Sequence, residues 1–218
     1  MAVRGRRPLG SPDARRAVLD AARKLFAESG FERATMRAVA ARAEVDPALI
    51  YHYFGDKDGL LSAAIEIPAD LAAAVAGVAS DTGRTGEELV ERVITLLEYR
   101  PEVRERMLAT LRTALSHHQA AELLRDRLGS VLLAAFGPAL ASDRRELRVA
   151  LIASQMGGLM LARYIIEVPG AAAASPRDLA QAVGPVIQHY LTGTIGPAGQ
   201  RDPSAASSPE APDRPVTS

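Results

Sequence analysis

Hydrophobic residues recur every three or four positions through most of the chain, which is the spacing of one face of an α-helix. The first such stripe consists of Val18, Leu19, Ala22, Leu25 and Phe26. The second consists of Met36, Val39, Ala40 and Ala43, and similar stripes continue to about Thr192. No alternating strand pattern competes with them. The pattern therefore predicts an all-α chain.

Capping residues mark where several of the predicted helices begin. Ser11, Asp46 and Ser175 each precede a proline, and this pair combines a side-chain hydrogen-bond acceptor with a residue whose fixed φ suits the first helical turn. Thr35 and Asp56 are predicted to cap two further helices, and the helix after Asp56 is expected to run as far as residue 68. Gly30 can end the first helix in a left-handed conformation.

The second half of the chain also reads as helical. Residues 69–80 are rich in alanine, and residues 85–88 match the capping-box pattern. Ser142 is predicted to cap a long helix that reaches about Val168. Residues 196–218 consist largely of Pro, Ser and Ala with scattered charges, which indicates a disordered tail.

Charge is balanced over the whole chain but not along it. Lys and Arg together number 26, as do Asp and Glu, whereas residues 1–42 hold ten basic and four acidic residues. This local excess of positive charge favours a polyanionic partner, although a solvated surface can carry it as well. Residues 1–10 contain three arginines and are predicted to be a disordered basic arm that can lie along such a partner.

Several classes of protein find no support in the sequence. There is no cysteine, so disulfides and thiol chemistry are excluded. No apolar segment follows the basic N-terminus as in a signal peptide, and the uncharged stretch 149–162 is too short to span a bilayer. A cytoplasmic protein is therefore expected. The motifs of phosphate-binding loops, HExxH metalloproteases and GxSxG hydrolases are missing, so we expect neither an enzyme nor a cofactor or metal.

The most informative segment is residues 35–61, which reads as two short helices joined by a tight turn. The second helix carries Tyr51, His52 and Tyr53 in a row, on the face that its apolar residues leave free. Hydrogen-bonding aromatic side chains suit a helix that lies in the major groove of DNA. The alternative is an ordinary aromatic cluster on the surface or in the core.

Residues 14–65 resemble the DNA-binding domain of the TetR (tetracycline repressor) family. The resemblance rests on Ala-Ala-x-x-Leu-Phe-Ala-x-x-Gly-Phe at 21–31, on Thr-x-Arg-x-Val-Ala from Thr35, and on Leu-Ile-Tyr-His-Tyr-Phe at 49–54 with the following Lys57. It implies a three-helix DNA-binding domain with a helix-turn-helix at 11–55. A helical ligand-binding and dimerisation domain is then expected at 56–195.

The resemblance and the chemistry of the side chains together suggest which residues meet DNA. Thr35 and the helix N-terminus behind it can bind a phosphate, and Arg37 can reach a phosphate or a guanine edge. The helix that follows begins with apolar residues, which can touch thymine methyl groups. The predicted DNA-binding residues are Thr35, Arg37, Pro47, Ala48, Leu49, Tyr51, His52, Tyr53 and Lys57. Ile50 and Phe54 are expected in the core instead.

Two positions depart from the family pattern. Glu44 stands in the turn between the two short helices, where the family usually has glycine. If this residue is left-handed, its side chain costs about 1 kcal/mol. Asp46 replaces a frequent serine or threonine; it caps well but places negative charge near phosphates.

The last two long helices are predicted to form a dimer interface as a four-helix bundle with those of a second subunit. The residues predicted for it are Leu151, Gln155, Gly158, Ala162, Leu179, Val183, Val186, Ile187 and Tyr190. Burial within one subunit is the alternative. A mostly apolar ligand cavity is predicted from Tyr99, Met107, Leu111, Met156, Met160 and Tyr164, with plain core packing equally open. His118 and Glu122 are spaced to share a metal, but a solvated helix end explains them better.

These observations predict a ligand-responsive transcriptional repressor. It would bind a near-palindromic DNA operator as a homodimer and be released by a small-molecule inducer. The alternatives are a ligand-independent DNA-binding or architectural helical protein, and an all-helical enzyme.

Overall fold

The computed structural model describes residues 12–78 and 83–196, and over these ranges the chain forms eleven helices and no strand. The helices are α1 (Pro12–Ser29), α2 (Met36–Ala43), α3 (Pro47–Phe54), α4 (Lys57–Ala64), α5 (Ala69–Ala76), α6 (Thr85–Tyr99), α7 (Pro101–Ser116), α8 (His118–Phe136), α9 (Arg145–Tyr164), α10 (Pro169–Ala173) and α11 (Pro176–Thr192). The all-α prediction is confirmed.

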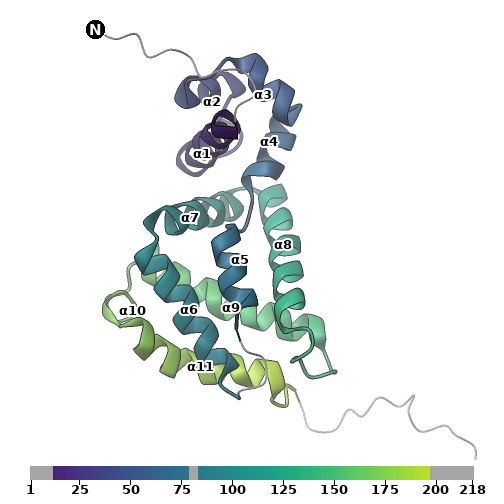
Figure 1. Cartoon of the computed structure of the whole chain (residues 1–218), viewed down its shortest axis with the longest axis vertical. Helices are drawn as coiled ribbons and strands as arrows, with labels where there is room; N and C mark the ends of the chain where they lie inside the picture. Colours follow the sequence, from purple (N-terminus) through teal and green to yellow (C-terminus); the bar gives the residue numbers. More distant parts are fainter. Residues whose placement is uncertain (1–11, 79–82, 197–218) are drawn as a thin grey trace, which may run out of the picture.

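The helices form a small and a large bundle joined by α4 (Figure 1). Helices α1, α2 and α3 pack together at one end of the molecule, and α4 leads from them into the larger bundle. There α5 lies at the centre among α6, α7, α8 and α9, while α11 runs along α6 on the outside. Helix α7 lies against α1, so the two bundles touch at a second place besides α4.

Most of the predicted helix starts are confirmed. The hydroxyl oxygen of Thr35 accepts a hydrogen bond from the Ala38 N–H, and the Asp46 and Asp56 carboxylates cap α3 and α4 in the same way. At α11, Ser175 forms a capping box with Asp178. Each cap satisfies N–H groups that have no partner within the helix, which stabilises the start at that residue.

Three predicted boundaries were wrong. The helix after Asp56 ends at Ala64 because Ile65 is extended, and a separate helix starts after Pro68. Thr85 does not cap α6; it is the first helical residue, and its side chain is buried. Ser142 does not cap α9, which starts at residue 145 after the left-handed Arg144. The short helix α10 was not predicted.

A buried arginine closes the far end of the large bundle. The side chain of Arg148 on α9 is 1% exposed and donates to the carbonyl oxygens of Tyr190 and Gly193 at 2.8 Å each. The same guanidinium bonds the backbone carbonyl and the carboxylate of Asp143. The Tyr190 and Gly193 carbonyls lie at the C-terminal end of α11, where carbonyls lack helical partners and carry partial negative charge. The arginine therefore fixes that helix end to α9.

The parts of the chain predicted to be disordered fall largely outside the described ranges. This holds for the basic arm at 1–10 and, after Gly196, for the tail at 197–218. The segment Lys57–Ala76 is long and apolar enough to cross a membrane by composition. In the structure it comprises two eight-residue helices whose leucines, among them Leu61 and Leu71, are buried in the protein core. The bundle core thus accounts for its hydrophobicity.

The turn between α2 and α3 is built on a left-handed glutamate. Glu44 has φ 55° and ψ 41°, and its N–H bonds back to the end of α2. The Val45 N–H donates to the Ala40 carbonyl at 3.0 Å, so the turn closes on the helix. A residue with a Cβ is strained in this conformation, whereas glycine is not.

We therefore expect Glu44→Gly to raise the free energy of unfolding by up to about 1 kcal/mol by removing this strain. Thermal or chemical denaturation measures the change, and affinity for DNA should not fall. Glu44→Ala is the matched control, since it removes the charge but keeps the strain. A lower midpoint for the glycine variant would contradict the prediction.

Candidate nucleic-acid interface

Helix α3 is anchored by one apolar edge. Ile50 is fully buried against the core of the small bundle, which also includes Phe26, Val39 and Val45. Phe54, at the end of α3, is half-buried with the Arg15 guanidinium 5.4 Å from its ring centre. The expected core positions of α3 are thus confirmed, and they orient the rest of this helix.

The opposite face of α3 is open to solvent. Tyr51 is 53% exposed, Ala48 and His52 are exposed, and Pro47 and Tyr53 are partly exposed. The rings of His52 and Tyr53 lie 5.6 Å apart, so the two side chains form one surface. This surface offers a phenol hydroxyl and an imidazole to a partner without any rearrangement of the core.

Leu49 corrects the prediction for the start of α3. Its side chain is 2% exposed and belongs to the core, so it faces away from the open surface and cannot meet thymine methyl groups. The residues around it explain the difference. Pro47 and Ala48 lie on the open side, whereas Leu49 follows 100° further around the helix and joins Ile50 inside.

The N-terminus of α2 presents a second group of polar atoms. Thr35 is exposed, and its hydroxyl accepts the Ala38 N–H at 3.1 Å while its own O–H can donate to a partner. Arg37 is exposed in the first turn of the same helix. A helix N-terminus next to an arginine is a favourable place for a phosphate.

Lys57 lies at the edge of this surface, but its side chain already has partners within the protein. Its ammonium group is 4.3 Å from the centre of the Phe31 ring and donates to the Glu32 carbonyl at 3.2 Å. On the α7–α8 corner, the His117 ring lies 4.3 Å from the same Phe31 ring. Sequence analysis missed this contact between the bundles, because no helical spacing links Phe31 to His117.

Other basic residues near α2 have structural partners. Arg42 forms two hydrogen bonds with the carboxylate of Glu28, at 2.6 and 2.9 Å, which join α2 to α1. The hydrogen bonds from Arg42 lower the pKa of Glu28 below its ordinary value. The basic excess at residues 1–42 therefore serves in part to hold the small bundle together.

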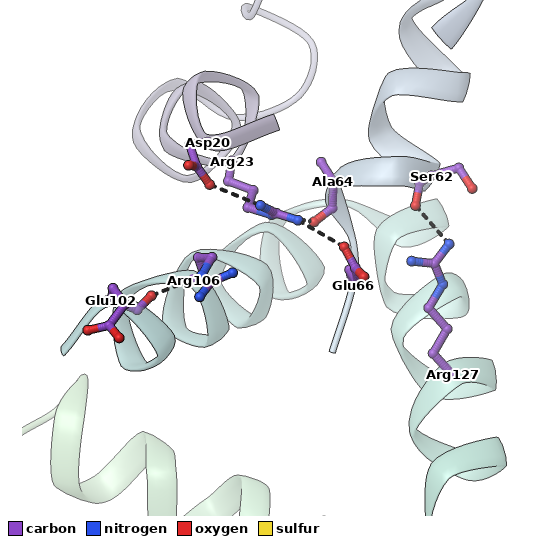
Figure 2. A network of polar contacts seen from close by, with 8 residues as sticks. All are labelled: Asp20, Arg23, Ser62, Ala64, Glu66, Glu102, Arg106 and Arg127. Atoms are coloured by element: carbon purple, nitrogen blue, oxygen red, sulfur yellow. Dashed lines mark hydrogen bonds and ion pairs between the residues drawn. The ribbon is translucent and has the colours of Figure 1, made fainter. Parts of the chain in front are cut away.

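The end of α4 is held by an arginine from α1 (Figure 2). Arg23 is buried and donates to the Ala64 carbonyl at 3.0 Å, while its other nitrogens meet Asp20 at 3.1 Å and Glu66 at 3.2 Å. Burial lowers the pKa of Arg23, and the two carboxylates oppose this shift. An unpaired buried charge is costly, so these contacts keep the guanidinium in place.

A second arginine reaches α4 from the large bundle. Arg127 on α8 donates to the Ser62 carbonyl at 2.8 Å (Figure 2). The last turn of α4 is thus bound on one side by the small bundle and on the other by the large one. Carbonyl oxygens at a helix C-terminus are suitable acceptors for such cations.

Two family models match the chain. Residues 18–64 match the model for bacterial regulatory proteins of the tetR family, and residues 84–191 match the tetracyclin repressor-like C-terminal domain. The chain belongs to the TetR family. It is therefore a DNA-binding transcriptional regulator with a helix-turn-helix, formed by α2 and α3, and it is not an enzyme.

Curated relatives resemble part of the chain. The transcriptional regulator BetI of Burkholderia thailandensis is 42% identical over 81 residues, which is 35% of this chain and 42% of that protein. The regulator HbdR of an Aromatoleum species is 47% identical over 47 residues, 22% of this chain and 20% of that protein. The match thus spans less than half the length of either relative.

Solved structures agree over nearly the whole fold. A TetR-family regulator of Streptomyces coelicolor has a TM-score of 0.62 at 29% identity, over 86% of this chain and 98% of that one. GusR of Salmonella enterica has a TM-score of 0.58 at 22% identity, over 84% and 98% of the chains, which is a likeness of fold alone.

The large bundle of this TetR-family regulator contains a cavity of about 80 Å³. Its wall includes Met107, Leu111, Met156 and Met160, so four of the six residues predicted for a ligand cavity do line one. The complete wall is Ile67, Leu71, Val75, Leu89, Val93, Met107, Leu111, Leu124, Leu128, Val131, Leu132, Ala153, Met156, Gly157 and Met160.

The two predicted tyrosines do not line this cavity. Tyr99 is 80% exposed at the end of α6. Tyr164 donates its hydroxyl to Glu98 at 2.8 Å, beside Arg163, which bonds the same carboxylate at 3.0 Å. Burial and the Glu98 carboxylate raise the pKa of Tyr164 to about 12, so the hydroxyl stays protonated as a donor.

The predicted dimer residues divide into two groups. Leu179 and Ile187 are buried within their own subunit, where α11 packs on α6 and α9, and they are therefore unavailable to a second subunit. Val186 and Gly158 are exposed. The remaining predicted residues are partly exposed: Leu151, Gln155, Ala162, Val183 and Tyr190.

The Nε2 atom of the exposed His118 lies 3.3 Å from a carboxylate oxygen of Glu122, one turn further along α8. Among the described residues, no group of three or more His, Asp or Glu side chains is placed to hold a metal. The pair is thus a solvated contact on one helix.

We expect substitutions at Tyr51 and at Leu49 to have different effects, the first on DNA affinity and the second on stability. Tyr51→Ala should lower affinity for DNA about tenfold, the loss of one hydrogen bond to a charged group, with little change in stability. Leu49→Ala should lower the free energy of unfolding by about 2–5 kcal/mol, because it empties a buried site.

The two variants are compared by denaturation and by fluorescence anisotropy on DNA fragments that the wild-type protein retains. Tyr51→Phe is the control that keeps the ring and removes the hydroxyl. Unchanged affinity of both Tyr51 variants would refute the assigned role.

Proposed function

We propose that this TetR-family regulator is a repressor that binds a near-palindromic operator as a homodimer in the cytoplasm and is released by a small-molecule inducer. The observation that carries the proposal is the position of the cavity. Its wall includes Ile67, which lies in the break between α4 and α5, and Leu71, which lies in the first turn of α5. A ligand in the cavity would therefore touch the segment that connects the two bundles.

On DNA, α3 would enter the major groove with Tyr51, His52 and Ala48 toward the base edges and adjacent backbone. Thr35 and Arg37 would bind phosphate at the N-terminus of α2, with Pro47, Tyr53 and Lys57 at the margin. The exposure of these side chains supports the assignment, since none has to leave the core. Phosphate contacts would set the register, and α3 would select the sequence.

A dimer would place two copies of α3 on successive major grooves, about one helical turn of DNA apart. The surface that supports this is the outer side of α9 and α11. It combines the exposed apolar Val186 and Leu147 with the small exposed Gly158, so that a second copy can approach closely. Sedimentation equilibrium on the wild type and on Val186→Glu tests the dimer.

The link from cavity to DNA would run through the end of α4. A ligand that displaces Ile67 or Leu71 shifts the start of α5, and the Ser62 and Ala64 carbonyls lie three to nine residues before these positions. Arg127 and Arg23 hold those carbonyls to different bundles. Two arrangements of α4 would then differ in the spacing of the two α3 helices, and the ligand would favour one of them.

Sequencing the DNA fragments that the purified protein retains tests the proposal as a whole. A repeated near-palindrome whose binding is lost with an added metabolite supports it. Binding that persists with every metabolite favours a ligand-independent DNA-binding protein, and retention of random sequence favours an architectural one.

Arg127→Met should weaken the link between ligand and DNA while leaving the DNA-binding surface intact. The variant removes the hydrogen bond to the Ser62 carbonyl but keeps most of the side-chain volume. We expect the ratio of DNA affinities without and with inducer to fall about fivefold or more, the size of a typical coupling.

Arg125→Met is the matched control on the same helix, because Arg125 is exposed and its ion pairs with Glu122 and Asp126 both lie on α8. The two variants are compared in DNA titrations at several inducer concentrations. Equal responses in both would rule out the role given to Arg127.

A further inference from the structure

The wall of the cavity offers no polar side chain to a ligand. Every residue that lines it is Ile, Leu, Val, Ala, Gly or Met. Polar side chains elsewhere on α9 are not part of the wall: Ser154 donates to the Leu151 carbonyl, and Arg163 and Tyr164 both bond Glu98. A ligand inside this cavity would therefore find contact with carbon and sulfur atoms, and no charged partner.

We infer that the ligand is a small, uncharged hydrocarbon-like molecule, such as a single aromatic ring or a short aliphatic chain. This inference rests on the proposed function and names the ligand class of the same site. A carboxylate or ammonium group would have to leave water with no compensating partner, which is strongly unfavourable. An apolar cavity without polar partners also holds no ordered water, so an apolar ligand displaces none.

The size of the cavity limits the ligand further. Its volume of about 80 Å³ is smaller than the roughly 150 Å³ of an apolar cavity that accepts benzene. Met107, Met156 and Met160 supply flexible, polarizable side chains that can shift to enlarge it. A one-ring molecule therefore fits after small rotamer changes, whereas a multi-ring drug does not.

Gly157 leaves part of this space open. It lies on α9 one turn after Ala153, and both line the cavity. A Cβ built at Gly157 would meet no atom within 4 Å, whereas a Cβ at Gly86 would lie 2.1 Å from the Gly184 carbonyl oxygen. The lack of a side chain at 157 is thus not required by helix packing, and it makes room for the ligand.

Toluene and benzoate test the ligand class, because they share a ring and differ in charge. Binding to the full-length protein is measured by calorimetry and by the shift of the melting temperature in sealed cells. We expect toluene to raise the melting temperature, and benzoate to bind at least about 100-fold more weakly. Comparable binding of benzoate, or no shift with either toluene or n-pentane, would overturn the inference.

Gly157→Leu shows whether binding occurs in this cavity, and Gly129→Leu is the matched control. Gly129 on α8 also has no atom within 4 Å of a built Cβ, but it does not line the cavity. Toluene affinity should fall at least about tenfold in the first variant and stay unchanged in the second. If Gly157→Leu fails to fold, Gly157→Ala should give a smaller loss. Equal toluene affinity in the wild type and the folded Gly157 variant would overturn the assignment.

The same titrations keep the two proposals apart. Suppose that toluene binds in the cavity, as judged by the Gly157 variants, but leaves DNA affinity unchanged. This result supports the ligand class and contradicts release by an inducer at this site. Release of DNA by a charged metabolite that competes with toluene contradicts the ligand class and supports induction.

Discussion

The structure depends on how the last carbonyl groups of α4 are bound. A helix end has unpaired carbonyls that need donors, and here the donors come from both bundles: Arg23 from α1 and Arg127 from α8. Four residues after Ala64, Pro68 precedes α5, and α5 leads into the apolar core of the large bundle. One short helix therefore connects the DNA-binding surface to the cavity, and its hydrogen bonds determine where the two bundles sit.

Apolar packing and polar contacts have separate tasks in this arrangement. Within the small bundle, Ile50 and Leu49 fix the roll of α3, which decides that Tyr51 and His52 face outward. Between the bundles, the directional contacts of Arg23 and of the His117–Phe31 pair add to an apolar core that continues through both bundles. Apolar packing thus keeps the DNA-binding surface rigid, and the directional contacts help to orient it on the large bundle.

The sequence predicted those features that depend on neighbouring residues. Caps such as Thr35 and Asp46 act within one turn. The left-handed conformation of Glu44 could be expected because the family usually has glycine at this position. Leu49 was misplaced because an eight-residue helix is too short for its periodicity to fix which face is inside. Contacts between distant segments, such as Arg127 with Ser62, leave no periodic trace, and whether Ile187 faces its own subunit depends on how whole helices pack.

The buried Arg148 holds the C-terminal end of α11. Its guanidinium donates to the carbonyls of Tyr190 and Gly193, so Gly193 is the last residue that Arg148 binds. A peptide or fluorescent label joined beyond residue 196 would leave that buried cation fully coordinated. A cut before residue 193 would remove at least the Gly193 acceptor, leave Asp143 to pair with the buried cation, and weaken the attachment of the C-terminal helix to α9.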